Sequence, residues 1–103
     1  MACVVYANVS PFLGYISIVL ESSVRFYLDD EEIQALYVIR DGNGSVLSDL
    51  VTEETLSWSD LWFDGSTQFG ELDLPVAPAE AGNYTLDIYF NNLFLTTAPF
   101  TIQ

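Results

Sequence analysis

The stretch that decides the fold reads Gly82-Asn83-Tyr84-Thr85-Leu86-Asp87-Ile88-Tyr89-Phe90-Asn91-Asn92. Apolar side chains alternate with others along residues 83–90, and four of them share one face: Tyr84, Leu86, Ile88 and Phe90. A period of two is typical of a β-strand with one buried side. The pair Asn91-Asn92 favours a tight two-residue turn, so residues 93–102 should return as the last strand. We predict that this returning strand is irregular near Pro99, because proline lacks the backbone N–H that pairs strands.

Short runs with the same alternation recur through the rest of the chain, separated by Gly, Pro, Asn and Asp. We predict strands at residues 3–9, 15–20, 23–28, 33–40, 45–50 and 68–74. The run 33–40 is apolar on both faces, which indicates a strand in the middle of a sheet. Ser10-Pro11 marks a break or an edge position. The segment Asp41-Gly42-Asn43-Gly44 favours a turn that joins 33–40 and 45–50 into a hairpin.

Residues 52–65 are ambiguous, because their large apolar side chains fit both helical and alternating spacing. We favour a strand or an irregular loop there. The whole chain then has about seven to nine short antiparallel strands, with turn signals roughly every eight to twelve residues and no convincing helix. This pattern predicts an all-β sandwich or a small barrel.

The composition predicts one folded domain over residues 1–103. Half of the residues are apolar and 15% are aromatic, which is far from the composition of disordered chains. A chain of this length can bury a core without metal or disulfides, and the one cysteine, Cys3, excludes an internal disulfide. Residues 1–20 are apolar, but they lack a basic start and contain Pro11 and Gly14. We therefore expect folded strand there and no membrane insertion.

The charge balance is strongly acidic. Fifteen Asp and Glu residues stand against Arg25 and Arg40, with no Lys and no His, which gives a formal net charge of −13. Because such a field repels phosphate, we expect no direct binding to nucleic acid. The same field attracts basic protein surfaces over a Debye length of about 8 Å. The acids therefore indicate either a merely solvated surface or a face for a basic protein partner.

The corner before the deciding strand, Glu80-Ala81-Gly82-Asn83-Tyr84-Thr85-Leu86, resembles the tyrosine-corner motif of immunoglobulin-like domains. The ending Pro99-Phe100-Thr101-Ile102 and the segment 37–44 are similar to bacterial extracellular members of that group. The resemblance implies an immunoglobulin-like β-sandwich in which the Tyr84 hydroxyl bonds nearby backbone and Gly82 belongs to the corner. Leu86 stands where antibody domains have a cysteine, which favours a disulfide-free bacterial or phage type. Domains of this kind serve mostly as spacers, adhesion modules and assembly contacts.

The residue inventory argues against catalysis. The chain lacks histidine and has a single cysteine near its start, which removes the usual general base, the nucleophile partners and the commonest zinc ligands. We expect no enzyme activity and no cofactor. Calcium is the one ion worth considering, because Asp29, Asp30, Glu31 and Glu32 supply hard oxygen ligands. Four consecutive acids are more often simply solvated.

The densest aromatic group is Trp58, Trp62 and Phe63. If exposed, these rings could bind a protein partner, as aromatic hot spots do. Large aromatic side chains also dominate the cores of small domains, and that alternative stays open.

Two functions follow from these observations. The leading hypothesis is a non-enzymatic immunoglobulin-like binding or assembly module of a bacterial surface, secreted or virion protein, which would act outside the cell. The alternative is a small acidic inhibitor of phage type, located in the cytoplasm, whose carboxylates imitate phosphates and block a basic nucleic-acid-binding protein. Carboxylates spread over the whole surface would count against the second hypothesis.

Overall fold

Eight β-strands and one short 3₁₀ helix make up most of the chain that the structure describes. The computed structural model describes residues 5–22, 32–57, 61–64 and 67–103, and side chains there except within 61–68. The elements are β1 (Val5–Phe12), β2 (Tyr15–Ser22), β3 (Glu32–Arg40), η1 (Ser48–Leu50), β4 (Thr52–Ser57), β5 (Leu61–Asp64), β6 (Thr67–Leu74), β7 (Gly82–Phe90) and β8 (Leu93–Ile102). Cys3 and the strand predicted at 23–28 lie outside the described residues.

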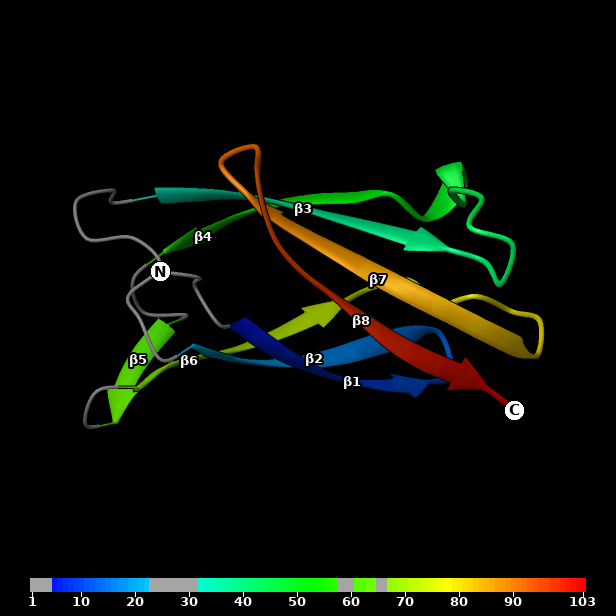
Figure 1. The fold of residues 1–103 in the computed structure, drawn as a ribbon, viewed down its shortest axis with the longest axis horizontal. Coiled ribbons are helices and arrows are strands. Elements are labelled where there is room, and N and C mark those ends of the chain that lie inside the picture. The colour runs from blue at the N-terminus through cyan, green and yellow to red at the C-terminus, as the bar shows by residue number, and fades with distance from the viewer. Residues whose placement is uncertain (1–4, 23–31, 58–60, 65–66) are drawn as a thin grey trace.

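The strands form two antiparallel sheets that face each other (Figure 1). One sheet has the order β1-β2-β6-β5 and the other has the order β4-β3-β7-β8. The all-β sandwich predicted from the sequence is therefore confirmed. The central position predicted for residues 33–40 is also confirmed, because β3 lies between β4 and β7.

Apolar side chains from both sheets meet in one core. Burial alternates residue by residue along β2 and β3, as the period of two requires. The fully buried apolar residues come from β2, β3, β6 and β7: Ile16, Ile18, Leu20, Ile33, Tyr37, Ile39, Leu74, Leu86, Ile88 and Phe90. Burying one such side chain contributes about 1.5–3 kcal/mol. With a single cysteine in the chain, this packing is what joins the sheets.

Tyr84 fixes the loop that crosses from one sheet to the other. Its hydroxyl donates a 2.7 Å hydrogen bond to the carbonyl oxygen of Glu80, and its ring stacks on Phe100 with centroids 5.5 Å apart. Gly82 has a φ of 156°, which residues with a side chain rarely adopt. Leu86, two residues beyond Tyr84, is fully buried in the core. The chain thus enters β7 with its direction set by one buried tyrosine.

The strand predicted at residues 45–50 is wrong. Asp41 Oδ1 accepts hydrogen bonds from the backbone N–H groups of Asn43 and Ser45, at 2.9 and 3.0 Å, and holds a tight turn. After the turn only a single bridge, Arg40 with Val46, joins this segment to β3. The chain then forms η1, from which Leu50 packs against the core. The antiparallel partner of β3 is β4 instead, so the ambiguous stretch 52–65 supplies strands.

The two prolines inside strands both lie at sheet edges. β1 continues through Pro11 to Phe12, beyond the predicted end at residue 9, because β1 is an edge strand and needs no donor on its outer side. Pro99 pairs regularly with Thr85, so the irregularity predicted there is wrong. The register shift lies instead between Ile88 and Tyr89, opposite an extra residue in β8.

The turn predicted at Asn91-Asn92 is confirmed. Both residues have positive φ, 49° and 68°, which is the conformation of a type I′ hairpin turn. The hairpin is also attached to β3: Asn91 N–H donates to the Gln34 carbonyl, and Gln34 N–H donates to Asn91 Oδ1, both at 2.8 Å. The turn therefore holds β8 and β3 in place around β7.

The Tyr84→Phe variant tests the corner. Because the Glu80 carbonyl would lose its partner in a partly buried place, we expect the free energy of unfolding to fall by about 1–3 kcal/mol. Tyr6→Phe is the matched control, since Tyr6 is 64% exposed and should change stability by less than about 0.5 kcal/mol. Urea denaturation measures both, and unchanged stability of Tyr84→Phe would contradict the role of the hydroxyl.

The Asn92→Ala variant tests the hairpin turn. Asparagine tolerates left-handed backbone better than alanine, so we expect a loss of about 1 kcal/mol in unfolding free energy. Asn92→Gly, which is free to adopt positive φ, should keep or raise the stability. If alanine and glycine give equal stability, the left-handed turn does not contribute as described.

Candidate protein-binding faces

The structure describes the aromatic group predicted to bind a protein partner only in part. Trp58 lies outside the described residues, and Trp62 and Phe63 are described only as backbone positions in β5, paired with Phe69 and Gln68 of β6. The binding role of this aromatic group therefore stays a prediction.

Of the four consecutive acids considered as calcium ligands, the structure describes only the last one. Asp29, Asp30 and Glu31 lie outside the described residues, and Glu32 is an exposed residue at the start of β3. Within the described part of the chain, no three Cys, Asp or Glu side chains come together in a way that could hold a metal ion. Calcium binding stays a prediction.

The outward side of the sheet β1-β2-β6 carries a row of carboxylates that sequence reasoning did not find. Glu21, Glu71 and Asp73 are all exposed. Val19 pairs with Glu71 and Ser17 with Asp73, so strand pairing brings acids from distant parts of the sequence onto one surface. No described residue that points outward from these three strands is basic. We call this surface the acidic face.

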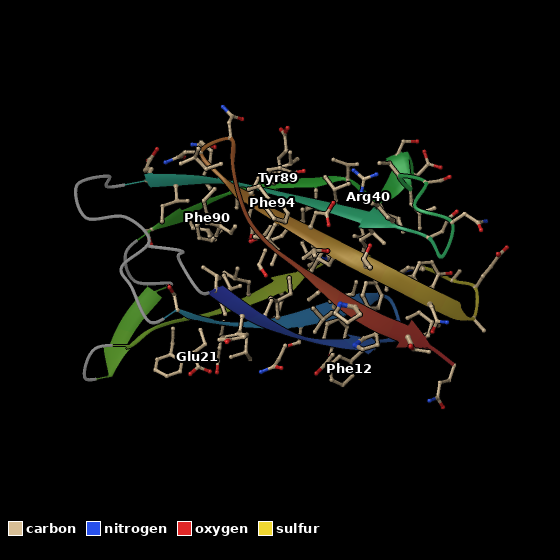
Figure 2. The ribbon with its side chains drawn as sticks, viewed as in Figure 1. Phe12, Glu21, Arg40, Tyr89, Phe90 and Phe94 are labelled. Carbon is tan, nitrogen blue, oxygen red and sulfur yellow. The ribbon has the colours of Figure 1, made fainter. Side chains whose placement is uncertain are left out.

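Exposed apolar side chains lie on the same face. Tyr6 is 64% exposed and pairs with Glu21, and Val19 is also exposed. At the end of the β1–β2 hairpin the Phe12 and Tyr15 rings stack with centroids 4.8 Å apart and remain exposed. Figure 2 shows Phe12 and Glu21 on the side of their sheet that points away from the other sheet. Negative charge and aromatic surface are thus available to one partner.

The outward side of the other sheet has a different character. Arg40 Nε donates a 2.9 Å hydrogen bond to Asp87 Oδ2. The Asp87 side chain is only 12% exposed, so this ion pair neutralises a nearly buried acid on the outward side of β7. The hydrogen bond to Asp87 raises the pKa of Arg40, because it favours the charged guanidinium. Tyr89 and Phe94 meet edge to face beyond this pair, at 5.6 Å between centroids.

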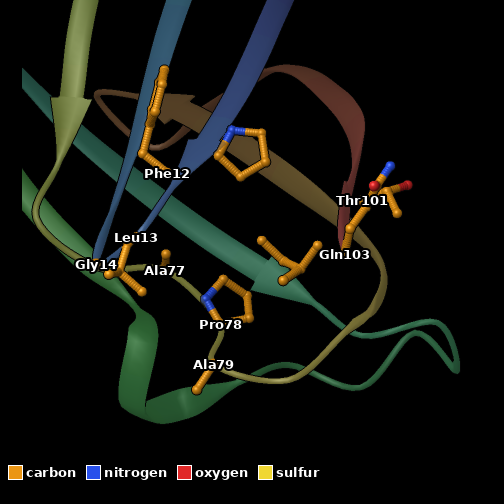
Figure 3. A pocket seen from close by; sticks show the side chains of 10 residues that line it. Phe12, Leu13, Gly14, Ala77, Pro78, Ala79, Thr101 and Gln103 are labelled. Carbon is orange, nitrogen blue, oxygen red and sulfur yellow. The ribbon is translucent and has the colours of Figure 1, made fainter.

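A hollow of about 660 Å³ lies at one end of the sandwich (Figure 3). It is lined by the tip of the β1–β2 hairpin, the loop at 77–79 and the last three residues, including Phe12, Leu13, Pro78 and Ile102. No lining side chain is titratable. The lining side chains of the hollow can therefore contact an apolar group.

A second hollow of about 510 Å³ lies beside η1 and Tyr84. Three acids line it, Asp41, Asp49 and Glu80, together with apolar residues. Asp41 is already engaged with the backbone of its own turn. The Asp41 carboxylate therefore stabilises its own turn, and Asp49 and Glu80 are exposed acids at the hollow.

Comparison with protein-family models and with curated proteins found no match for this chain. Among the described residues, no helix has the length and apolar character needed to span a membrane. The acidic face could have been anticipated only in part: Glu21, Glu71 and Asp73 occupy outward positions of alternating strands, but their neighbourhood depends on which strands pair.

Proposed function

We propose that this protein is a non-enzymatic immunoglobulin-like binding module whose acidic face docks a basic surface of a protein partner. Two features support the immunoglobulin-like assignment. The strand orders β1-β2-β6-β5 and β4-β3-β7-β8 correspond to the orders A-B-E-D and C′-C-F-G of that fold. The hydrogen bond from Tyr84 to Glu80 has the position and direction of a tyrosine corner.

The observation that carries the binding proposal is the combination of charge and apolar surface on one sheet. Glu21, Glu71 and Asp73 are exposed beside Tyr6 and Val19, with no described basic side chain on that side. Opposite charges steer a partner and set its orientation, whereas aromatic side chains supply most of the binding energy at protein interfaces. The surface therefore suits a partner that presents Arg or Lys beside apolar side chains.

A binding role agrees with the chemistry of the chain. It has no histidine, the residue most often used as a general base, and the first hollow has no titratable side chain in its lining. A module of a bacterial surface, secreted or virion protein, working outside the cell, is the setting that the fold resemblance favours. Fold alone does not determine function, so the proposed binding role rests on the acidic face and its charges.

The described carboxylates weigh against nucleic-acid mimicry. Exposed ones lie on the acidic face, on β3 at Glu32, on β4 at Glu53, and at the end of the sandwich at Asp49 and Glu80. An inhibitor that occupies one basic groove would need its acids gathered on one surface. The described carboxylates are spread over several surfaces, and this spread counts against a mimic of a phosphate backbone.

Peptide binding tests the proposal directly. The probes are two synthetic peptides of equal length, one alternating Arg with Leu and the other alternating Arg with Ser, titrated by calorimetry at low and high NaCl. We expect tighter binding of the Arg-Leu peptide, and weaker binding of both peptides at high salt because screening reduces the attraction. The variant Glu21→Gln/Glu71→Gln/Asp73→Asn should bind the Arg-Leu peptide about tenfold more weakly.

A second triple variant separates the face from the overall charge. Asp49→Asn/Glu53→Gln/Glu80→Gln removes the same amount of negative charge from exposed positions elsewhere. We expect this control to retain the affinity within about twofold. Equal weakening of both variants would show that diffuse charge, and not the acidic face, attracts the peptide.

A further inference from the structure

The turn that follows β3 contains Asn43, the only asparagine in the chain that is followed by glycine. Asn43 and Gly44 are both exposed. The side-chain amide of an asparagine can be attacked by the backbone nitrogen of the next residue, and glycine hinders this attack least because it has no Cβ. The space around Gly44 is also open, since no other part of the protein lies within 4 Å of where a Cβ would stand. Sterically, the pair Asn43-Gly44 is therefore accessible to this reaction.

The reaction needs no reagent other than water. In the first step the backbone nitrogen of Gly44 forms a bond to Cγ of Asn43 and the bond from Cγ to Nδ2 breaks. The proton lost from the Gly44 nitrogen leaves with the amide group as ammonia, and a cyclic succinimide remains. In the second step water adds to one of the two ring carbonyls and opens the ring. The product at position 43 is aspartate or isoaspartate, and either one carries a negative charge that asparagine lacks.

The hydrogen bonds of the turn occupy the nitrogen that would attack. The Gly44 N–H donates to the carbonyl oxygen of Asp41 at 3.0 Å. The Gly44 carbonyl oxygen accepts a hydrogen bond from Arg40 Nη1, also at 3.0 Å. An N–H group that donates to a carbonyl is harder to deprotonate, and the two bonds hold the Gly44 peptide groups in the geometry of the turn. Attack on Asn43 therefore requires that the turn opens first.

The Asp41 side chain holds the turn closed on both sides of Gly44. Its Oδ1 accepts hydrogen bonds from the backbone N–H of Asn43 at 2.9 Å and from that of Ser45 at 3.0 Å. The backbone N–H of Asp41 donates in turn to the Ser45 carbonyl at 3.0 Å. Hydrogen bonds to a charged carboxylate are stronger than those between neutral groups. The Asp41 carboxylate therefore opposes the opening that the reaction needs.

We propose that Asn43 is a site of spontaneous deamidation, and that Asp41 is a positioning residue that slows the reaction by keeping the Gly44 N–H bonded inside the turn. The modification destabilises the turn that produces it. Isoaspartate lengthens the backbone between positions 43 and 44 and places a second carboxylate beside that of Asp41, which repels it. The acidic face takes no part in this reaction, so deamidation and peptide binding are tested independently of each other.

Peptide mapping by mass spectrometry measures the conversion of Asn43 over time in the full chain, incubated in mildly alkaline buffer. The same chain in concentrated guanidinium chloride gives the rate for the open turn. Because several hydrogen bonds must break before attack, we expect the folded protein to react at least about tenfold more slowly than the unfolded one. Equal rates in the two states, or no conversion of Asn43 in guanidinium chloride, would overturn the proposal.

Asp41→Ala tests the positioning role, because it removes the carboxylate and leaves the reacting pair Asn43-Gly44 unchanged. We expect Asn43 to deamidate about tenfold faster in this variant under folding conditions, and at the native rate in guanidinium chloride. Asp49→Ala is the matched control, since it removes the same charge from an exposed residue of η1 outside the turn.

The Asp49→Ala control should keep the native rate within about twofold. Circular dichroism verifies that both variants are folded during the incubation, and the comparison of the folded with the unfolded native chain needs no variant. If Asp41→Ala reacts no faster than the native protein, or if Asp49→Ala accelerates the reaction equally, the Asp41 carboxylate does not control the modification and the proposal is wrong.

Discussion

The structure depends on one constraint: two four-stranded sheets must share a single apolar core without a disulfide between them. The period of two, which is regular along β2 and β3, assigns alternate side chains to that core and the others to an outer surface. Because inward positions are committed to packing, polar groups there need partners. Tyr37, which is fully buried, donates its hydroxyl to Glu54 at 2.7 Å. Outward-facing polar groups can bond to water instead, and the two sheets carry different side chains on their outward sides.

Local devices position the sheets around the core. The Tyr84 hydroxyl fixes the crossing loop before β7, and the left-handed Asn91-Asn92 turn sets how β8 returns along it. The bulge at Leu95 then lets β8 contribute one side chain to the core and another to the surface. Each device acts on β7, which pairs with both β3 and β8. β7 therefore supplies side chains both to the core and to the outward side of its sheet.

Sequence patterns anticipated what short-range chemistry determines. The strands at 33–40, 68–74 and 83–90 and the Asn91-Asn92 turn follow from alternation and turn propensity, which act within a few residues. The strand at 45–50 does not form, because the backbone N–H groups of Leu50 and Val51 bond to the carbonyls of Leu47 and Ser48 in a 3₁₀ turn, and β4 pairs with β3 instead. Alternation carries no information about such a bond. The acidic face escaped prediction for another reason: Glu21 and Glu71 become neighbours only through the pairing of β2 with β6.

We propose that the acidic face binds a basic protein partner, because Glu21, Glu71 and Asp73 are exposed there beside Tyr6 and Val19. Amide chemical shifts, measured by NMR while the labelled protein is titrated with the Arg-Leu peptide, test this binding. We expect the peptide to move the signals of residues 19–21 and 71–73 and to leave those of 36–38, 89 and 94–97 in place. Signals that move equally on both sheets, or that do not move on the acidic face, would contradict the proposal.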